Sequence, residues 1–350
     1  MNDFYVGTIS LLVSNVLLSS YPILIKSYIT NISIVVQLIV RIVVYICLAL
    51  PFLVIGGEGM NILTTLIEPK YLAISAVNML HIYSSYKGFE YLNAGIALTT
   101  FYSYPIIQVL LAHIFLGTEL TSGLMYNLFG SLLGIAILNK DTLLGGEKIA
   151  NVNLASNLQP RPFLKGNARQ VTPHDENMVK KGFSFIAIAA LTEAIIGVFY
   201  KGVNIQNPFM SLYSLYAPAF VFFMIWYLYQ KYKESQEVKN KANVANWTDE
   251  KIQKEKDGKK DNWWHILTNH GGFMKRIILY NILIGGIGYT LRLFSLTKIP
   301  ISWFSGLSFT SSLSAFMLGW FFLGERIKLN HILGSIVIFY NLFKIKNAHF

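Results

Sequence analysis

The chain has 350 residues, of which 53% are hydrophobic and only 13% carry a charge. A soluble globular protein carries about 25% charged residues, so this composition excludes a water-soluble globular protein. The formal net charge of +11 does not indicate a nucleic-acid partner, because the basic residues lie mainly in two loops between apolar segments. The single cysteine, Cys47, excludes an intrachain disulfide.

Apolar segments recur along the whole chain at roughly 20 residues, the length that a helix needs to cross about 30 Å of hydrocarbon. They predict an all-α integral membrane protein with ten transmembrane helices. The expected spans are 4–25, 33–55, 70–89, 93–116, 122–139, 182–203, 208–230, 273–293, 299–323 and 329–345. The first segment lacks a basic leader and is followed by more spans, so we expect a helix there and not a signal peptide.

Two polar segments interrupt this pattern, at 140–181 and 231–272. We expect both to be solvated connecting loops. The second is rich in lysine between Lys231 and Lys260, and part of it is expected to form a solvated helix. The alternative is a surface that binds anionic lipid headgroups or a regulatory partner.

The parts of the chain before and after the first loop, 1–139 and 182–350, echo each other. The first predicted span ends in Ile-Lys at 25–26 and the sixth ends in Tyr-Lys at 200–201. The fourth closes with LGTEL at 116–120 and the ninth with LGERI at 323–327. Five helices per half force opposite orientations on the two halves. This is the inverted repeat of many secondary transporters, which bind their substrate between the halves near the membrane midplane.

These motifs resemble the drug/metabolite transporter superfamily of the EamA type. The likeness rests on the five-plus-five pattern, on LGER at 323–326, on YPIIQVLLAHIFLGTEL at 104–120 and on Arg41 in the second span. It covers nearly the whole chain and implies a ten-helix fold with a central cavity that transports metabolites such as amino acids, purines or drugs. The chain departs from the family pattern at Thr118, where the family places glutamate, and in its lysine-rich loop.

Basic residues give conflicting indications of orientation. Seven Lys or Arg lie in 140–181 and eleven in 231–276, and the positive-inside rule would place both regions in the cytoplasm. The resemblance implies the reverse, with cytoplasmic termini. We expect cytoplasmic termini, because most of the counted basic residues lie in long polar loops, to which the positive-inside rule applies poorly.

Glu193 lies near the middle of the span 182–203, in the run AALTEAIIGVFYK at 189–201. A carboxylate in hydrocarbon is costly, so it is expected to face a cavity or a partner. Burial favours its neutral form and would let it exchange a proton for a cationic substrate. The run resembles the first helix of the small multidrug resistance family, in which a glutamate eight residues before a lysine binds drug and proton alternately, and Lys201 matches that spacing. The alternative is a structural glutamate neutralised by an arginine or hydrogen-bonded to Ser and Thr.

Two arginines fall within or near the predicted spans. Arg41 lies eight residues after Ser33, too deep to reach the interface freely. It can anchor an anionic substrate, form a fixed ion pair with Glu193, or orient the mouth of a cavity; we favour a structural role. Arg292, near the end of the span 273–293, is expected to extend to the interface.

Uncharged polar and aromatic side chains complete the candidate binding residues, either as cavity lining or as hydrogen-bonding contacts between helices. They are Asn78, His81, Tyr102, Tyr104, Gln108, Tyr216, Trp303 and Ser308. Asn78 and His81 share a helical face because they are three residues apart. Gly130 and Gly134 form a GxxxG face that favours helix association or dimerisation.

The chain has no Walker sequence, no dinucleotide fingerprint and no HExxH motif, so we expect neither an ATP-driven pump nor a metalloprotease, and no cofactor or bound metal. A secondary transporter, driven by a gradient or by exchange, fits best. Its expected partners are a small-molecule substrate and membrane lipid, with a homodimer left open and no nucleic acid. The alternatives are a non-transporting scaffold or receptor and a membrane-embedded lipid-modifying enzyme.

Overall fold

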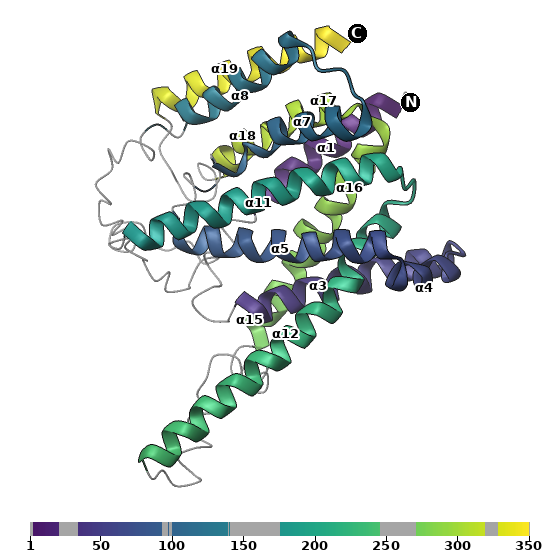
Figure 1. The fold of residues 1–350 in the computed structure, drawn as a ribbon. Helices are drawn as coiled ribbons and strands as arrows, with labels where there is room; N and C mark the ends of the chain where they lie inside the picture. Colours follow the sequence, from purple (N-terminus) through teal and green to yellow (C-terminus); the bar gives the residue numbers. More distant parts are fainter. Residues whose placement is uncertain are drawn as a thin grey trace.

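The structure, a computed structural model, describes residues 3–20, 34–92, 97, 100–138, 140, 176–245, 271–318 and 328–349. The described residues form helices and connecting turns (Figure 1). The helices are α1 (Asp3–Ser19), α3 (Ile34–Ile55), α4 (Gly59–Ile67), α5 (Pro69–Tyr91), α7 (Tyr104–Leu116), α8 (Ser122–Leu138), α11 (Glu176–Val203), α12 (Pro208–Ala245), α15 (Gly271–Tyr280), η1 (Asn281–Gly286), α16 (Ile287–Lys298), α17 (Ile301–Ser308), α18 (Thr310–Leu318) and α19 (Leu329–His349).

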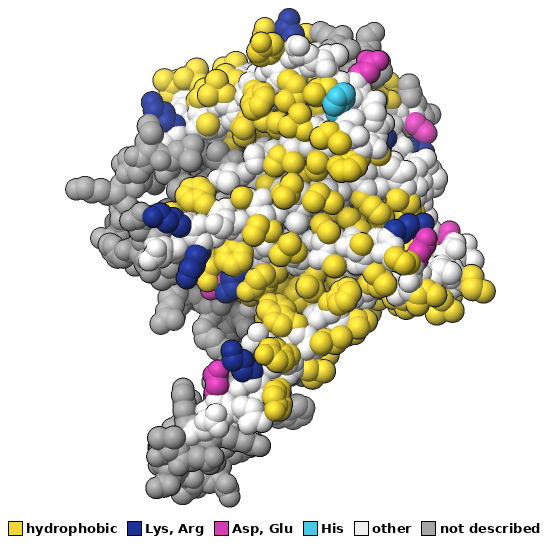
Figure 2. All heavy atoms as spheres, in the orientation of Figure 1, with side chains coloured by type: hydrophobic (Ala, Val, Ile, Leu, Met, Phe, Trp, Pro, Cys, Tyr) yellow, Lys and Arg dark blue, Asp and Glu magenta, His cyan; other side chains and the backbone are white. Residues whose placement is uncertain are grey.

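The surface of the bundle is apolar where a soluble protein would be polar. Large hydrophobic side chains such as Ile114, Tyr126 and Ile225 are more than half exposed. Figure 2 shows such side chains across the middle of one face, with most charged side chains toward its margins. Within the described ranges, four helical stretches are long and apolar enough to cross a membrane: Ile34–Ile55, Val179–Val203, Pro208–Glu237 and Lys275–Lys298. Contiguous apolar surface of this kind suits contact with lipid.

Each predicted span overlaps at least one of the described helices, but several boundaries were wrong. Four apolar helices or helical stretches are shorter than a full span in the part of the chain that is described: α1, α7, α8 and Leu329–Ile345 of α19. The predicted end of the first span, at 21–25, and that of the ninth, at 319–323, lie outside the described residues. The motif at 323–327 lies outside them too. The chain ends lie on the same side of the bundle (Figure 1).

Two polar segments predicted as loops are partly helical. Helix α11 already begins at Glu176, and α12 continues to Ala245 with 38 residues. The expectation of partial helix in 231–272 is therefore confirmed as far as Ala245, and the far end of α12 projects from the bundle (Figure 1). Residues 141–175 and 246–270 lie outside the described ranges. The sequence analysis also missed α4, a short helix that exposes Met60, Leu63 and Ile67, as an interfacial helix does.

Three predicted spans depart from regular α-helix. Residues 281–286 of the eighth form a π-helical segment, η1, between α15 and α16. The ninth divides at Phe309 into α17 and α18, and the fourth has a turn at Tyr102–Ser103 before α7 begins. π-helical segments occur often at functional sites, and interrupted helices form the binding sites of many transporters.

Helices α8 and α19 pack along each other at glycine contacts. A Cβ atom at Gly134 would lie 3.0 Å from the carbonyl oxygen of Gly334, and one at Gly130 would lie 2.4 Å from Oδ1 of Asn341. The predicted glycine face therefore joins two helices of the same chain, and a homodimer would need another surface. The pair lies at one edge of the bundle (Figure 1).

We expect Gly334→Ala to lower the free energy of unfolding by about 1–3 kcal/mol, the usual cost of overpacking. The added Cβ would lie 2.6 Å from the carbonyl oxygen of Gly134 and 2.7 Å from the backbone nitrogen of Leu138. Gly123→Ala on α8 is the control, because nothing lies within 4 Å of its Cβ position. Thermal unfolding in detergent micelles measures both; equal melting temperatures would contradict this packing.

Candidate functional site: a buried carboxylate and its polar partners

Glu193 lies on α11 and is only 6% exposed. Its Oε1 accepts a hydrogen bond from Nε of Arg292 at 3.0 Å, and Nη2 of the same guanidinium lies 2.9 Å from this oxygen in an ion pair. Its Oε2 accepts from the hydroxyl of Tyr289 at 3.1 Å and faces Nε2 of His81 at 3.3 Å. Both carboxylate oxygens are thus satisfied, which a buried charge requires. The predicted need of Glu193 for a partner is met inside the protein.

Arg292 corrects the sequence analysis, which placed it at the interface. It is buried on α16, and its Nη2 also donates to the hydroxyl of Tyr104 at 2.7 Å. The guanidinium carbon lies 5.4 Å from the ring centre of Tyr104 and 4.9 Å from that of Phe304. A guanidinium stacked on rings and bonded to a carboxylate is held in one orientation. Arg292, and not Arg41, is the ion-pair partner of Glu193.

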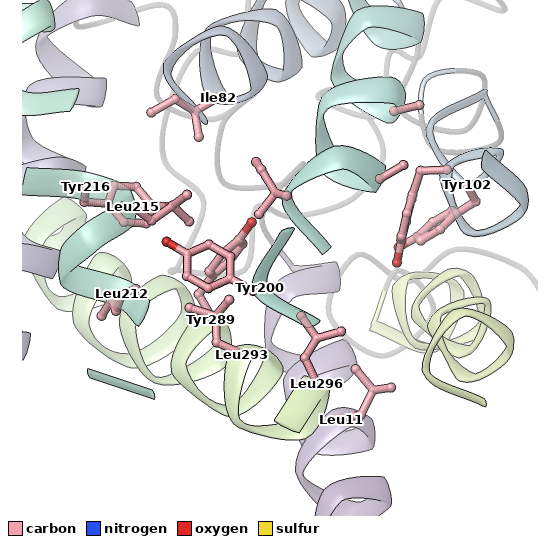
Figure 3. Packing of buried hydrophobic residues seen from close by; sticks show 14 of the residues in the cluster. Leu11, Ile82, Tyr102, Tyr200, Leu212, Leu215, Tyr216, Tyr289, Leu293 and Leu296 are labelled. Atoms are coloured by element: carbon pink, nitrogen blue, oxygen red, sulfur yellow. The ribbon is translucent and has the colours of Figure 1, made fainter. Parts of the chain in front are cut away.

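Arg41 binds a neighbouring group of aromatic residues. Its Nη2 donates to the hydroxyl of Tyr216 at 3.1 Å, and its guanidinium lies 5.2 Å from the ring centre of Tyr45. The ring of Tyr216 meets that of Tyr289 edge-on, with centres 6.2 Å apart. Both tyrosines belong to the packed centre of the bundle (Figure 3). Arg41 and Glu193 are therefore linked through Tyr216 and Tyr289.

Asn78 and His81 share a face of α5, as their spacing predicted, but bind different helices. Nδ2 of Asn78 donates to the carbonyl oxygen of Leu215 on α12 at 3.1 Å, and the hydroxyl of Ser75 donates to the same atom at 3.0 Å. His81 faces α11 instead. Asn78 thus joins α5 to α12 one residue from Tyr216, whereas His81 belongs to the Glu193 cluster.

The turn before α7 and the break between α17 and α18 lie together. Tyr104 interacts with Ser308, the last residue of α17, and Tyr102 interacts with Ser311 on α18. The carbonyl oxygen of Leu307, near the break, accepts a hydrogen bond from Asn15 at 2.9 Å. An interruption frees backbone groups that need other partners, and here side chains of α1 and α18 supply them.

Two predicted binding residues lie apart from the carboxylate. Trp303 donates from Nε1 to Thr8 at 3.0 Å and stacks on Phe4, at the beginning of α1. Gln108, one helical turn after Tyr104, packs on α11 so closely that a Cβ at Gly197 would lie 2.1 Å from its Nε2. Neither amide atom of Gln108 has a hydrogen-bond partner among the described residues, although the side chain is 1% exposed.

Tyr289 was not among the predicted site residues, and Arg292 was predicted to lie at the interface. Both lie on one face of α16, three residues apart, which is the spacing that brings side chains together on a helix. An arginine three residues after a tyrosine within an apolar segment was the available signal. Lys201, singled out for its spacing from Glu193, donates to the carbonyl oxygens of Leu296 and Ile299 at the end of α16. Its observed contacts are those of a helix cap.

We expect Arg292→Gln to destabilise the protein by about 3–5 kcal/mol, because it leaves a buried carboxylate without its cation. The double variant Glu193→Gln, Arg292→Gln should recover part of this loss. Arg276→Gln, at an exposed position of α15, is the control and should stay within about 0.5 kcal/mol of wild type. Unfolding measured for wild type, Glu193→Gln, Arg292→Gln and the double variant gives the coupling; strictly additive effects would refute the ion pair.

We expect Gln108→Met to raise the melting temperature, since methionine keeps the length of the side chain and removes a buried amide whose desolvation costs about 1–3 kcal/mol. Asn15→Leu is the contrasting variant. Nδ2 of Asn15 donates both to the carbonyl oxygen of Leu307 and to Thr310 at 2.9 Å, so its loss should lower the melting temperature. A lower value for Gln108→Met would mean that its amide has a partner in the folded protein.

Comparison with known proteins agrees with this architecture. No curated protein matches the chain. Twenty-eight chains of solved structures match, and one of them, a crystal structure described only as that of a protein, covers 99% of this chain and 98% of its own with a TM-score of 0.65. Its sequence identity is 9%, so the likeness shows the fold alone. A family model for EamA-like transporters matches residues 5–140 and 180–344. The chain therefore belongs to the EamA-like transporter family, a family of multi-pass membrane transporters within the drug/metabolite transporter superfamily.

Proposed function

We propose that the protein is a secondary transporter that moves a small polar or amphipathic solute by alternating access. In this proposal ten spans form two inverted five-helix halves, at 1–139 and 182–350, and the cluster around Glu193 couples transport to a cation gradient. Family membership supplies the transporter class, and the coupling, the span count and the solute class are the proposal.

The observation that supports the proposal most strongly is the origin of the cluster. His81 and Tyr104 come from the first matched segment, and Glu193, Tyr289 and Arg292 come from the second. Inverted-repeat transporters bind substrate and coupling ion between their halves. An ionisable cluster joining the two halves responds to any movement that separates them. A buried ion pair within one half would have no such role.

Helix interruptions beside the cluster support the same reading. The π-helical segment η1 precedes Tyr289 by three residues, and the division between α17 and α18 follows Ser308, which interacts with Tyr104. Interrupted helices can bend at these points while the rest of each helix stays rigid. We therefore assign solute contact to Tyr102, Tyr104, Gln108 and Ser308, and charge coupling to Glu193.

The occupancy of Glu193 constrains the mechanism. Nε and Nη2 of Arg292, the hydroxyl of Tyr289 and Nε2 of His81 surround its two oxygens. A cationic solute therefore cannot reach the carboxylate in this arrangement. Exchange at Glu193 needs a second arrangement in which at least one of these donors moves away. The coupling ion and the solute would then bind in different conformations, as alternating access requires.

We expect solute uptake into proteoliposomes to depend on an imposed pH gradient and on Glu193. The panel comprises amino acids, nucleosides and organic cations, and Glu193→Gln should abolish gradient-driven uptake while the protein stays folded. Glu90→Gln is the matched control, because Glu90 forms a partly exposed ion pair with Lys87 on α5 at 2.7 Å. It should retain wild-type flux.

Three outcomes separate the alternatives. Flux that persists unchanged in Glu193→Gln would leave a transporter in which Glu193 is structural. Flux lost equally in Glu90→Gln would point to general damage to charge or folding. Absence of flux for the whole panel, with folded protein in sealed vesicles, would contradict transport of these solute classes and favour a scaffold.

A further inference from the structure

The imidazole of His81 has a defined orientation and proton position. Its Nδ1 lies 3.0 Å from the carbonyl oxygen of Ala189, one turn before Glu193 on α11. A carbonyl oxygen only accepts hydrogen bonds, so Nδ1 must carry a proton. The hydroxyl of Thr192 lies 3.4 Å from the same nitrogen and donates to backbone carbonyls. It therefore presents a lone pair to the Nδ1 proton and favours the same tautomer.

With Nδ1 protonated, the state of Nε2 decides the contact with Glu193. Nε2 lies 3.3 Å from Oε2. A neutral imidazole in this tautomer has a lone pair at Nε2, which would face a carboxylate oxygen that also offers only lone pairs. The contact is repulsive unless one proton lies between the two atoms. The proton can belong to either partner. Imidazolium with carboxylate and imidazole with carboxylic acid contain the same number of protons.

The other groups facing this pair do not share its proton. From α16, Arg292 holds Oε1 and Tyr289 donates to Oε2. From α7, the hydroxyl of Tyr104 accepts from Arg292. A guanidinium stays charged at every working pH, and the phenol proton of Tyr289 is donated to Oε2.

More distant groups contribute fixed charge or none. Arg41 on α3 acts through the hydroxyl of Tyr216 on α12, and Tyr102, in the turn before α7, interacts with Ser311. The ring of Phe101 lies 6.1 Å from that of His81 and has no titratable group. Around this contact, His81 and Glu193 are thus the two groups between which a proton can be exchanged.

We propose that His81 and Glu193 form one shared proton-binding site, with the proton held between Nε2 and Oε2, and that its release drives α5 and α11 apart. The proposal rests on the proposed function and names its coupling ion and second ligand. When the proton is bound, a charge-assisted hydrogen bond joins the two halves. When the proton leaves for solvent, two lone pairs face each other at the same distance, and the contact opposes closure of the halves.

Proton counting on the purified protein tests the shared site without any transport measurement. The pH of detergent-solubilised protein in unbuffered solution is raised from about 5 to about 9, and released protons are counted with an indicator dye. Glu193→Gln and His81→Gln should each release one proton fewer than wild type. In Glu193→Gln the new amide donates its own hydrogen to Nε2, so the site needs no proton from solution. The double variant should also release only one proton fewer, because both substitutions remove the same proton.

The control is Gly123→Ala, which adds a methyl group at an open position of α8 and removes no ionisable group. It should release the wild-type number of protons. Additive loss for His81 and Glu193 would overturn the shared site, and so would a full wild-type count in Glu193→Gln. Size-exclusion chromatography establishes that each variant is folded.

A second measurement needs no substitution at the site. Nitrogen NMR of the protein with labelled histidine should show one imidazole that keeps its Nδ1 proton from pH 5 to 9 while only Nε2 titrates. If no histidine behaves in this way, the inferred tautomer is wrong. A shared proton in a protein that shows no flux would support the shared site and contradict the transporter proposal. Glu193-dependent flux with additive proton losses would support the transporter and contradict the shared site.

Discussion

The centre of this protein is organised by the cost of burying one negative charge. An ionised carboxylate away from water is unfavourable by several kcal/mol unless hydrogen-bond donors surround it. Glu193 meets this requirement with donors from α5 and α16, and Tyr104 of α7 holds the arginine that supplies two of them. Four helices are therefore fixed relative to one another around a single side chain. The same requirement explains why positions 289 and 104 hold tyrosines and not phenylalanines, because their hydroxyls bond to Glu193 and Arg292.

Close backbone approach plays the complementary role at the edge of the bundle. Helices do not gain from the hydrophobic effect when their surroundings are lipid, so small residues that allow tight packing must hold them together. Gly134 and Gly334 do this for α8 and α19. Polar contacts thus organise the centre, where movement would break them, and van der Waals contact organises the edge.

The sequence allowed the class of the protein, its family and the need of Glu193 for a buried partner to be predicted. Hydrophobic segment length and the cost of an intramembrane carboxylate both depend on local composition, which can be read directly from the chain. The partner of Glu193 could not be read in this way, since Arg292 is 99 positions away. Its depth was also misjudged by a helix boundary: α16 continues to Lys298 and not to 293, which moves Arg292 more than a turn deeper. Lys201 stabilises that longer end from another helix, and only the folded chain shows it.

The length of α12 has a mechanical consequence. At 1.5 Å per residue, its 38 residues extend about 57 Å, nearly twice the thickness of a hydrocarbon core of about 30 Å. The helix can therefore act as a lever arm. Its inner part contains Tyr216 and Leu215, which bond to Arg41 and Asn78, and its outer part ends at Ala245. A tilt that shifts side chains near the centre by a fraction of an ångström is enlarged several-fold at Ala245. The position of Ala245 thus reports, in enlarged form, the tilt of α12 beside Tyr216.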